Sequence, residues 1–322
     1  MLRFITRYLI TLLSFPQNFK IIKLENKGKK IQEYLISKIN SFHYKYKEKK
    51  QKIHIRFSNY VLDIIKKKKL TNFLRFSFIQ KIFFIHNRFY IFQELKELKK
   101  DKKKWKFWEK LLLENDIGNP IRYFLYKKSS GNRIRQVYHL KNFCDYSNLN
   151  LKKIKYVIEI GGGYGCMASI FYKINPNIKY FIFDTKEVNL LQYYYLAMNN
   201  LSVSLGIDKT SRINLLNNIN DFKKIKNIFL KQQKKGILIA NWSISEMPFS
   251  LRRKLNFIYK SLSYILISFQ DVFENLDNIR FFNKIKKNFF LNSSIIIPIK
   301  TMNNNIFSST KNFYFFSKNN FL

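Results

Sequence analysis

The chain has 322 residues, of which 46% are apolar and 33 are phenylalanine, and this composition excludes a disordered polar polypeptide. Its two cysteines, Cys144 and Cys166, argue against a disulfide scaffold and suit a reducing, cytoplasmic compartment. The formal charge of +40 favours an anionic partner. However, both halves of the chain are basic, and biased codon usage is an alternative source of the lysines. The charge therefore does not mark a dedicated nucleic-acid-binding tail.

Residues 1–104 contain few glycines or prolines and predict a basic helical region. The region begins with the stretch MLRFITRYLITLLSF, which is apolar but interrupted by Arg3 and Arg7. It is shorter than the roughly 20 apolar residues that a membrane span needs. We interpret it as a basic amphipathic helix that packs on the protein or rests on an anionic membrane. The second arrangement would place the protein peripherally at the inner membrane surface.

Residues 105–150 predict a connector that caps the site of the following domain. Within it, the stretch ENDIGNP ends a helix and starts a turn at Gly118, Asn119 and Pro120. Asp116 and Asn119 would line the acceptor side of a site if this stretch folds over it. The alternative is that Gly-Asn-Pro is simply a good turn. His139, in RQVYHLKNF, belongs to the same segment.

From residue 155 onward, short β-rich runs alternate with helical stretches. This alternation predicts a parallel sheet covered by helices on both faces. The last two runs are joined by a polar loop too short for a crossover helix, so they predict an antiparallel hairpin. We expect a Rossmann-like α/β domain over residues 151–322 whose seven-stranded, mostly parallel sheet ends in this hairpin. The predicted strands are 155–160, 179–184, 212–216, 236–242, 264–270, 294–300 and 312–318.

A glycine-rich turn follows the first predicted strand. The stretch GGGYG holds four of the nine glycines of the chain and leads into a helix. Glycines there let the backbone approach a ligand closely, with the N–H groups of the helix facing it. A tight turn without a ligand is the alternative. The turn predicts a nucleotide-like cofactor bound by Gly161, Gly162, Gly163, Tyr164 and Gly165.

Two cofactors fit this turn. Gly163, Gly165 and Ala168 satisfy the dinucleotide pattern G-x-G-x-x-G/A, which leaves an NAD-dependent enzyme open. Glu159 stands two residues before the first glycine, where it can bind the ammonium group of S-adenosyl-L-methionine directly or through water. The terminal hairpin also fits a methyltransferase sheet. Asp184 ends the second strand and either binds both ribose hydroxyls or is a helix-capping or loop carboxylate. S-adenosyl-L-methionine is the favoured cofactor.

Five stretches in order resemble the bacterial sugar O-methyltransferases met among surface-polysaccharide biosynthesis proteins, which are class I S-adenosylmethionine-dependent methyltransferases. They span about residues 105–290 and read ENDIGNP, VIEIGGGYG, FDTKEVNLLQYYYL, ANWSISEMP and ISFQDVFENLDNIRFF. The resemblance implies methyl transfer to a sugar hydroxyl of a surface glycan or of its nucleotide- or lipid-linked precursor. The polar loop KTMNNNIFSSTK leaves the choice of sugar open.

The stretch NWSISEMP follows a predicted strand, and ligands lie beyond the carboxyl ends of parallel strands. Asn241 and Ser243 can hydrogen-bond the cofactor or a sugar hydroxyl, and Trp242 can stack on adenine or on a sugar face. Glu246 is the favoured general base for the hydroxyl proton, and its alternative role is a carboxylate in the first turn of a helix. His139 is the rival base because it titrates near neutral pH, although a single histidine is more often structural.

Gln270 and Asp271 end the next predicted strand and can contact the acceptor. One carboxylate makes a poor metal site, so we expect no required metal. Two other functions stay open. An RNA methyltransferase of the same fold is favoured by the charge, but residues 1–110 show no RNA-binding motif. A non-catalytic, membrane-associated scaffold in glycan assembly is the other.

Overall fold

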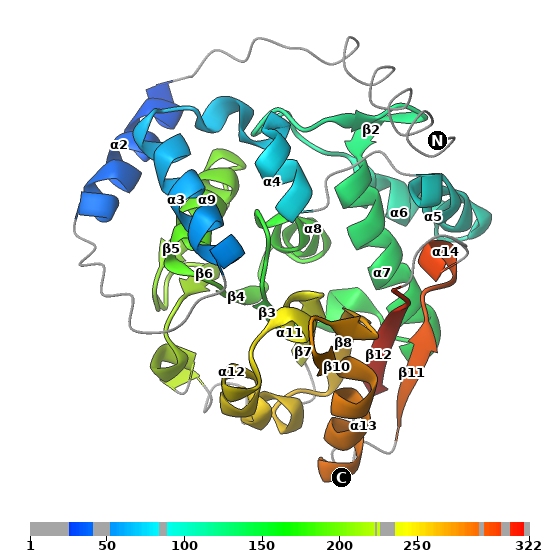
Figure 1. The fold of residues 1–322 in the computed structure, drawn as a ribbon. Helices are drawn as coiled ribbons and strands as arrows, with labels where there is room; N and C mark the ends of the chain where they lie inside the picture. Colours follow the sequence, from blue (N-terminus) through cyan, green and yellow to red (C-terminus); the bar gives the residue numbers. More distant parts are fainter. Residues whose placement is uncertain are drawn as a thin grey trace, which may run out of the picture. The chain divides into compact units, whose positions relative to one another are not determined.

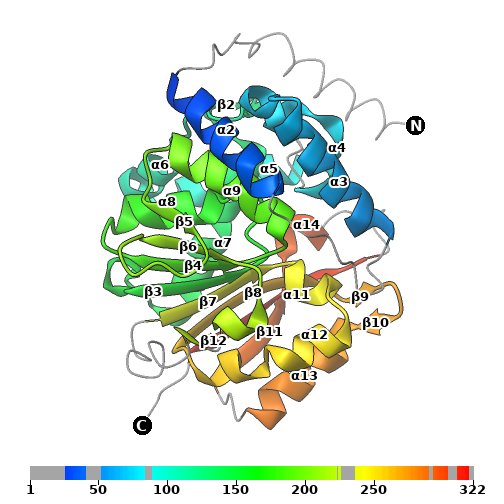
Figure 2. The same ribbon diagram turned by 90° about the vertical axis from the view of Figure 1, so that its left-hand side faces the viewer.

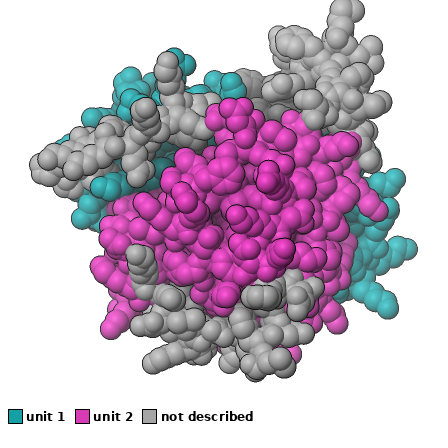
Figure 3. All heavy atoms as spheres, turned by 60° about the horizontal axis from the view of Figure 1, so that its bottom comes forward, with its two compact units in different colours: residues 1–138, 163–169, 185–203 teal, residues 139–162, 170–184, 204–322 magenta. Residues whose placement is uncertain are grey.

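The structure is a computed structural model, and it describes residues 26–40, 52–83, 89–222, 224–225, 236–289, 293–303 and 310–318. The chain divides into two compact units, teal and magenta in Figure 3. Unit 1 takes residues 1–138, 163–169 and 185–203, and unit 2 takes residues 139–162, 170–184 and 204–322. This division crosses the boundaries predicted after residues 104 and 150, which stay predictions.

The main sheet has eight strands, and seven of them lie wholly in unit 2. The pairs β3–β4, β3–β7, β4–β6 and β7–β8 are parallel, whereas β12 runs antiparallel to both β8 and β11. In spatial order the strands are β11 (Ser294–Pro298), β12 (Asn312–Lys318), β8 (Tyr264–Gln270), β7 (Gly236–Asn241), β3 (Tyr156–Ile160), β4 (Lys179–Phe183), β6 (Ile213–Leu216) and β5 (Val203–Leu205).

The predicted fold class is confirmed. All seven predicted strands are present, and the last two form the predicted antiparallel hairpin. The central strand β7 is buried along almost its whole length, as expected for a parallel strand covered on both faces. The sheet has one strand more than predicted, the edge strand β5. Its three residues, Val-Ser-Leu, are too few to give a recognisable alternating pattern.

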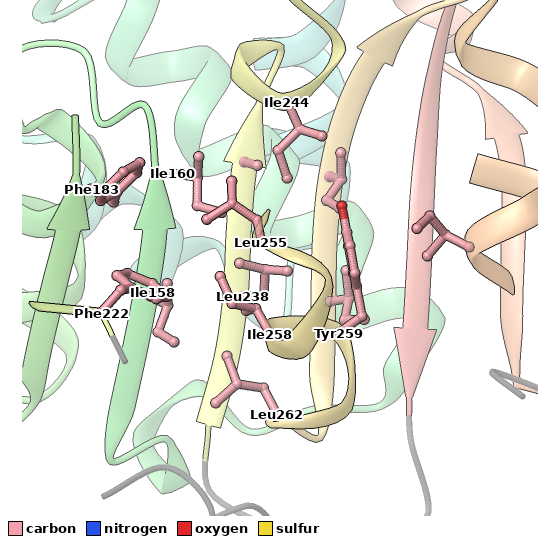
Figure 4. Packing of buried hydrophobic residues seen from close by; sticks show 14 of the residues in the cluster. Ile158, Ile160, Phe183, Phe222, Leu238, Ile244, Leu255, Ile258, Tyr259 and Leu262 are labelled. Atoms are coloured by element: carbon pink, nitrogen blue, oxygen red, sulfur yellow. The ribbon is translucent and has the colours of Figure 1, made fainter. Parts of the chain in front are cut away.

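Alternate residues of the central strands face opposite sides of the sheet. On one side, Ile158 and Ile160 of β3 and Leu238 of β7 belong to a large apolar cluster, shown in Figure 4. Figure 2 shows the covering helices α12 and α13 on one side of the sheet. On the other side, Phe143 of α7 contacts the rings of Tyr264 and Phe316. The elements that join or cover these strands are α7 (Gly131–Ser147), η3 (Leu151–Lys153), α8 (Cys166–Ile174), α11 (Ser243–Glu246), α12 (Phe249–Lys254), η5 (Asn256–Lys260), β9 (Val272–Phe273), β10 (Leu276–Asp277), α13 (Asn278–Asn288) and α14 (Lys300–Asn303).

Unit 1 is mainly helical, as the composition of the N-terminal region predicts. Helices α2 and α3 pack against α9, and Figure 1 shows the three side by side. The predicted amphipathic helix at residues 1–15 lies outside the described residues. The elements of unit 1 include α2 (Asn26–Asn40), α3 (Lys52–Lys66), η2 (Leu70–Arg75), α4 (Ser77–Ile82), α5 (Phe89–Lys100), α6 (Trp105–Leu112), β1 (Arg122–Tyr123), β2 (Tyr126–Ser130) and α9 (Lys186–Met198).

Among the described helices, none combines the length and the apolar character needed to cross a bilayer.

Candidate active site

The carboxyl ends of four adjacent strands of unit 2 carry most of the predicted site residues. Strands β4, β3, β7 and β8 are neighbours and parallel, so their carboxyl ends meet at one edge of the sheet. Asp184 follows β4, Gly161 follows β3, Asn241 ends β7 and Gln270 ends β8. The parallel register therefore gathers residues that lie far apart in the sequence.

Gly161 marks a close contact between the ends of β3 and β7. Its φ is +72°, a left-handed conformation that favours glycine, and its N–H donates to the Phe183 carbonyl at 2.9 Å. A Cβ at this position would lie 2.2 Å from the Cβ of Ser243. The Ser243 hydroxyl in turn donates to the Ile160 carbonyl. Glycine is therefore required here by both backbone conformation and space, and Ser243 ties α11 to the end of β3.

Glu159 is a buried carboxyl group beside the glycine turn. Only 3% of the residue is exposed, and its Oε2 accepts a hydrogen bond from the Tyr180 hydroxyl at 2.8 Å. The pKa of Glu159 is raised to about 8, mainly because a buried carboxylate is poorly solvated and also because of the neighbouring charge of Asp184. The Tyr180 hydrogen bond opposes this shift. Near neutral pH the group is therefore largely protonated until a cation approaches it.

Asp184 lies at the end of β4 and is half-buried. Its backbone N–H donates to the Leu216 carbonyl at 2.9 Å, which fixes the backbone position of the residue beside β6. The N-cap position of α9 belongs to Thr185, whose side chain makes no capping hydrogen bond, and Asp184 stands one residue before it. A role in binding ribose hydroxyls stays a prediction.

Trp242 turns the chain sharply out of β7. Its φ of 65° is uncommon for a bulky residue, and conformations of this kind cluster at functional sites. The residue is only 8% exposed, and its indole donates from Nε1 to Asn312 Oδ1 at 3.2 Å and lies 5.4 Å from the ring of His139. Asn241, just before it, accepts from the Ser268 hydroxyl at 2.8 Å. Trp242 thus contributes to the packing of unit 2, and its predicted stacking on a ligand is untested.

His139 lies in the interior of unit 2. The residue is fully buried, and its Nδ1 lies 2.6 Å from the Tyr314 hydroxyl, to which Asn142 also donates. This environment is typical of a structural histidine. It favours Glu246 over His139 as the candidate base.

Glu246 is a half-buried carboxyl group at the end of the short helix α11. Burial raises its pKa to about 7, and a hydrogen bond from the Gln270 side chain opposes this shift. A carboxylate with this pKa can accept a proton efficiently near neutral pH. The predicted pair Glu246 and Gln270, from the ends of α11 and β8, therefore lies together.

Arg252 holds the backbone on both sides of Glu246. The guanidinium is fully buried, and it donates to the Ser245 carbonyl at 2.6 Å and to the Met247 carbonyl at 2.7 Å. It also donates to Asn278 Oδ1 at 2.8 Å, and the Asn278 amide donates to the Gln270 carbonyl at 2.9 Å. We call Arg252 and Asn278 the clamp. The sequence gives no signal for it, because Arg252 stands in a basic run beside an exposed Arg253.

Asp271 is held in the loops that follow β8. Its Oδ1 accepts from the backbone N–H of Val272 at 2.8 Å and of Lys311 at 3.2 Å. This carboxylate organises the start of β9 and the loop before β12. Its predicted contact with the acceptor stays a prediction.

Three predicted residues of the glycine turn belong to unit 1. Tyr164 is buried, and its hydroxyl accepts from Asn132 at 3.1 Å and donates to Glu114 Oε1 at 3.3 Å. The Gly163 carbonyl accepts from the Gln192 side chain at 3.0 Å. The Tyr164 side chain thus anchors the turn within unit 1, and any contact of this residue with a cofactor falls to its backbone.

Asp116 and Asn119 have partners inside unit 1. Asp116 pairs with Arg122 at 2.7 Å. Asn119 is buried, has a φ of 55°, and donates from Nδ2 to Asn72 Oδ1 at 2.8 Å. The Asn119 N–H also donates to the Asp116 carbonyl at 2.8 Å, across the Gly118 turn. Their contact with an acceptor stays a prediction.

Among the described residues, no group of three or more His, Cys, Asp or Glu side chains is placed to hold a metal ion.

No protein-family model matches the chain, and no curated protein sequence matches it. Solved structures match at low identity. An O-methyltransferase family protein from Burkholderia thailandensis is 11% identical, with a TM-score of 0.36 over 58% of this chain and 60% of that chain. An N-methyltransferase from Haemonchus contortus, solved with phosphomonomethylethanolamine and S-adenosylhomocysteine, is 12% identical, with a TM-score of 0.41 over 68% and 59%. The fibrillarin pre-rRNA processing protein of Methanococcus jannaschii is 12% identical, with a TM-score of 0.35 over 53% and 70%. The chain spans about 60% of the length of the first of these proteins. Likeness at this level carries no functional information by itself.

Proposed function

We propose that this protein is an S-adenosylmethionine-dependent O-methyltransferase whose acceptor is a sugar hydroxyl of a bacterial surface glycan or its precursor. The arrangement at the carboxyl ends of β4, β3 and β7 carries the proposal. There a buried Glu159 lies in β3, a left-handed Gly161 and a half-buried Asp184 directly follow β3 and β4, and Ser243 begins the helix α11 after β7. The reversed strand β12 beside β8 supports a methyltransferase sheet rather than an all-parallel dinucleotide domain.

The chemistry of these residues suits S-adenosylmethionine. The raised pKa of Glu159 means that its anion lacks solvation in the free protein, and the ammonium group of the cofactor would stabilise that anion. Asp184 can accept both ribose hydroxyls, and the backbone at Gly161 has no side chain to obstruct a ligand. When bound, the cofactor supplies an electrophilic methyl group on a sulfonium. NAD offers no ammonium group to Glu159.

Glu246 is the proposed general base. It would accept the proton of the acceptor hydroxyl while that oxygen forms its bond to the methyl carbon and the bond from this carbon to the sulfonium sulfur breaks, so that sulfur leaves as a neutral thioether. Its pKa of about 7 leaves a substantial fraction ionised at neutral pH. The clamp holds the backbone beside Glu246, so positioning would add to the rate. Gln270 hydrogen-bonds Glu246 and would orient its carboxylate.

A sugar hydroxyl is the favoured acceptor because five stretches of the chain resemble bacterial sugar O-methyltransferases. The amides of Asn241 and Gln270 can hydrogen-bond sugar hydroxyls at the same edge of the sheet. RNA is the second candidate acceptor, because the charge of +40 would attract it.

Calorimetric titration of the folded chain with S-adenosylmethionine, and separately with NAD, tests the cofactor. We expect saturable binding of S-adenosylmethionine alone, and we expect Asp184→Ala and Gly163→Arg to abolish it. Asp221→Ala is the matched control, because it removes a carboxylate of unit 2 that pairs with Lys224 at the surface. Labelled methyl transfer to nucleotide-linked sugars, lipid-linked oligosaccharides and RNA then identifies the acceptor.

The outcomes separate the candidate functions. Binding of NAD in place of S-adenosylmethionine would make the protein a dinucleotide enzyme. Absence of binding by the folded wild type would favour the scaffold. Methylation of RNA but not of sugars would show that the protein is a methyltransferase whose acceptor is RNA.

A further inference from the structure

Unit 2 contains a cavity of about 490 Å³ away from the candidate active site. Its lining includes residues at the amino ends of β3, β4 and β6, whereas the candidate active site lies at the carboxyl ends. This volume is in the range of small-molecule sites. A ligand in this cavity would therefore be separate from the cofactor and the acceptor of the proposed function.

The lining of the cavity is strongly basic. Its charged residues are four cations and one carboxylate: Lys155, Lys179, Lys209, Arg212 and Asp208. A cavity lined mainly by one sign of charge concentrates ligands of the opposite charge, and Arg and Lys are the usual partners of phosphate groups.

The single carboxylate is engaged in holding the loop that forms one wall. Asp208 accepts hydrogen bonds from the N–H and hydroxyl of Thr210 at 2.9 and 2.8 Å, and from the Ser211 hydroxyl at 2.6 Å. These bonds lower the pKa of Asp208 to about 2. The carboxylate therefore serves as the centre of a turn, and the lining as a whole keeps an excess of positive charge.

The same loop is fixed from inside the unit. Asn214 is fully buried, accepts from the Asp208 N–H at 2.6 Å and donates to the Ser211 carbonyl at 3.2 Å. The Lys179 ammonium donates to the carbonyls of Lys209 and Ser211, which leaves one of its three N–H groups for a further acceptor. A preorganised wall lowers the entropy cost of binding a ligand.

Lys179 also reports the electrostatics of the cavity. Burial lowers the pKa of this ammonium, and the nearby positive charge of Arg212 lowers it further. An anion bound between Lys179 and Arg212 would oppose both effects. Apolar surface lies next to these cations, since Tyr156, Phe181, Ile207 and Ile225 also line the cavity, and 41% of Ile207 is exposed.

We propose that this cavity binds a small phosphorylated organic molecule. Its phosphate groups lie among Lys155, Lys179, Lys209 and Arg212, and its organic part packs on Tyr156 and Ile207. The phosphate provides the attraction, and the apolar wall distinguishes an organic phosphate from inorganic phosphate.

Calorimetry on the full chain, with uridine diphosphate, inorganic pyrophosphate and uridine as probes, tests the proposal. We expect uridine diphosphate to bind more tightly than pyrophosphate, and uridine not to bind. The variant Lys209→Glu/Arg212→Glu should weaken uridine diphosphate binding by about tenfold or more. The control Lys102→Glu/Lys103→Glu changes the net charge equally at two exposed lysines of unit 1 and should change binding by less than about twofold.

Several results would overturn the proposal. Equal weakening in both variants would show attraction to net charge alone, and no weakening in either would place the ligand elsewhere. Binding of uridine as tight as that of the diphosphate, or no binding of either phosphate probe, would also reject it. Equal binding of pyrophosphate and uridine diphosphate would reject the role of the apolar wall. If the double variant loses its cooperative thermal transition, the single variant Lys155→Glu, at an exposed lysine, repeats the test.

Discussion

Gly161 shows how one atom can decide the geometry of the candidate site. The variant Gly161→Ala would place a methyl group 2.2 Å from Ser243 Cβ in a residue with φ +72°. We expect a loss of about 2–4 kcal/mol in the free energy of unfolding, from the clash and from the left-handed backbone together. Urea denaturation measures it.

Gly163 provides the matched control. Its φ is +55°, but the nearest atom to an added Cβ is Phe83 Cδ1 at 3.6 Å, an ordinary contact. Gly163→Ala should therefore cost only about 1–2 kcal/mol, from the backbone alone. Replacing Ser243 by glycine in the Gly161→Ala background should recover the extra stability that Gly161→Ala loses relative to Gly163→Ala. Additive effects of Ser243→Gly and Gly161→Ala would contradict the clash.

Glu159 should make stability depend on pH. Its pKa rises from 4.5 to about 8 in the folded protein, so between these values the folded state binds a proton that the unfolded state has lost. The contribution of Glu159 to the free energy of unfolding is therefore present at low pH. It falls as pH rises, by about 1.4 kcal/mol per pH unit at most. Glu159→Gln keeps an acceptor for the Tyr180 hydroxyl and removes the titration. In urea unfolding from pH 5 to pH 8, the free energy of unfolding of the variant should rise relative to that of the wild type as pH increases. A constant difference would rule this out.

Glu246 should govern the pH dependence of methyl transfer. With a pKa of about 7, its basic form is populated above neutral pH, so kcat should rise through pH 7 and level off above it. We call this rise of kcat with pH the limb of the pH profile. Glu246→Gln should remove the limb and lower kcat by about 100-fold. Gln270→Leu removes a hydrogen bond that lowers the pKa of Glu246, so it should move the limb to higher pH. An unchanged limb in Glu246→Gln would exclude this residue as the base.

Among the elements of unit 2, the clamp connects α12, α13 and the end of β8 to the end of α11, which carries Glu246. Besides its three hydrogen-bond acceptors, the Arg252 guanidinium lies 5.0 Å from the ring of Phe249 and 4.8 Å from that of Phe281. Arg252→Lys keeps the charge but loses the planar set of donors. We expect kcat to fall at least about tenfold while the Kd for S-adenosylmethionine stays within about twofold.

Arg253→Lys is the control for this prediction, because Arg253 is the next residue and is exposed. The same change there should leave kcat and stability within experimental scatter. Equal effects at the two positions would show that the charge of α12, rather than the buried hydrogen bonds, supports Glu246.

At the scale of the whole molecule, unit 1 combines distant parts of the sequence. Helix α9 has nine buried residues out of 13, and α2 and α3 pack against it. A fragment of residues 105–322 would lack both helices and expose apolar residues of α9. We expect it to be insoluble or to lose cooperative urea unfolding, and co-expression with residues 1–104 to restore solubility. A stable, soluble fragment would instead support the predicted boundary at residue 104.

The strands of the main sheet other than β5, and the glycine turn, can be predicted from the sequence. Their signals are local: β-rich runs, the polar loop before β12, and glycines where β3 meets its helix. The sequence does not predict the edge strand β5, because an edge strand needs neither length nor apolar residues on both faces. Asp184 and Glu246 are predicted site residues because each comes shortly after a recognisable strand, and their roles stay predictions.

The contacts of these residues depend on how the elements pack, and the sequence does not predict them. Ser243 and Ile160 are 83 positions apart, and their hydrogen bond exists because β3 and β7 are parallel neighbours. Burial, which a sequence does not state, raises the pKa of Glu159 and Glu246. Burial also distinguishes two adjacent arginines of one basic run, since Arg252 is buried and Arg253 is exposed. The local sequence specifies the strands and helices. The packing of these elements against one another buries some side chains and brings them to their hydrogen-bond partners.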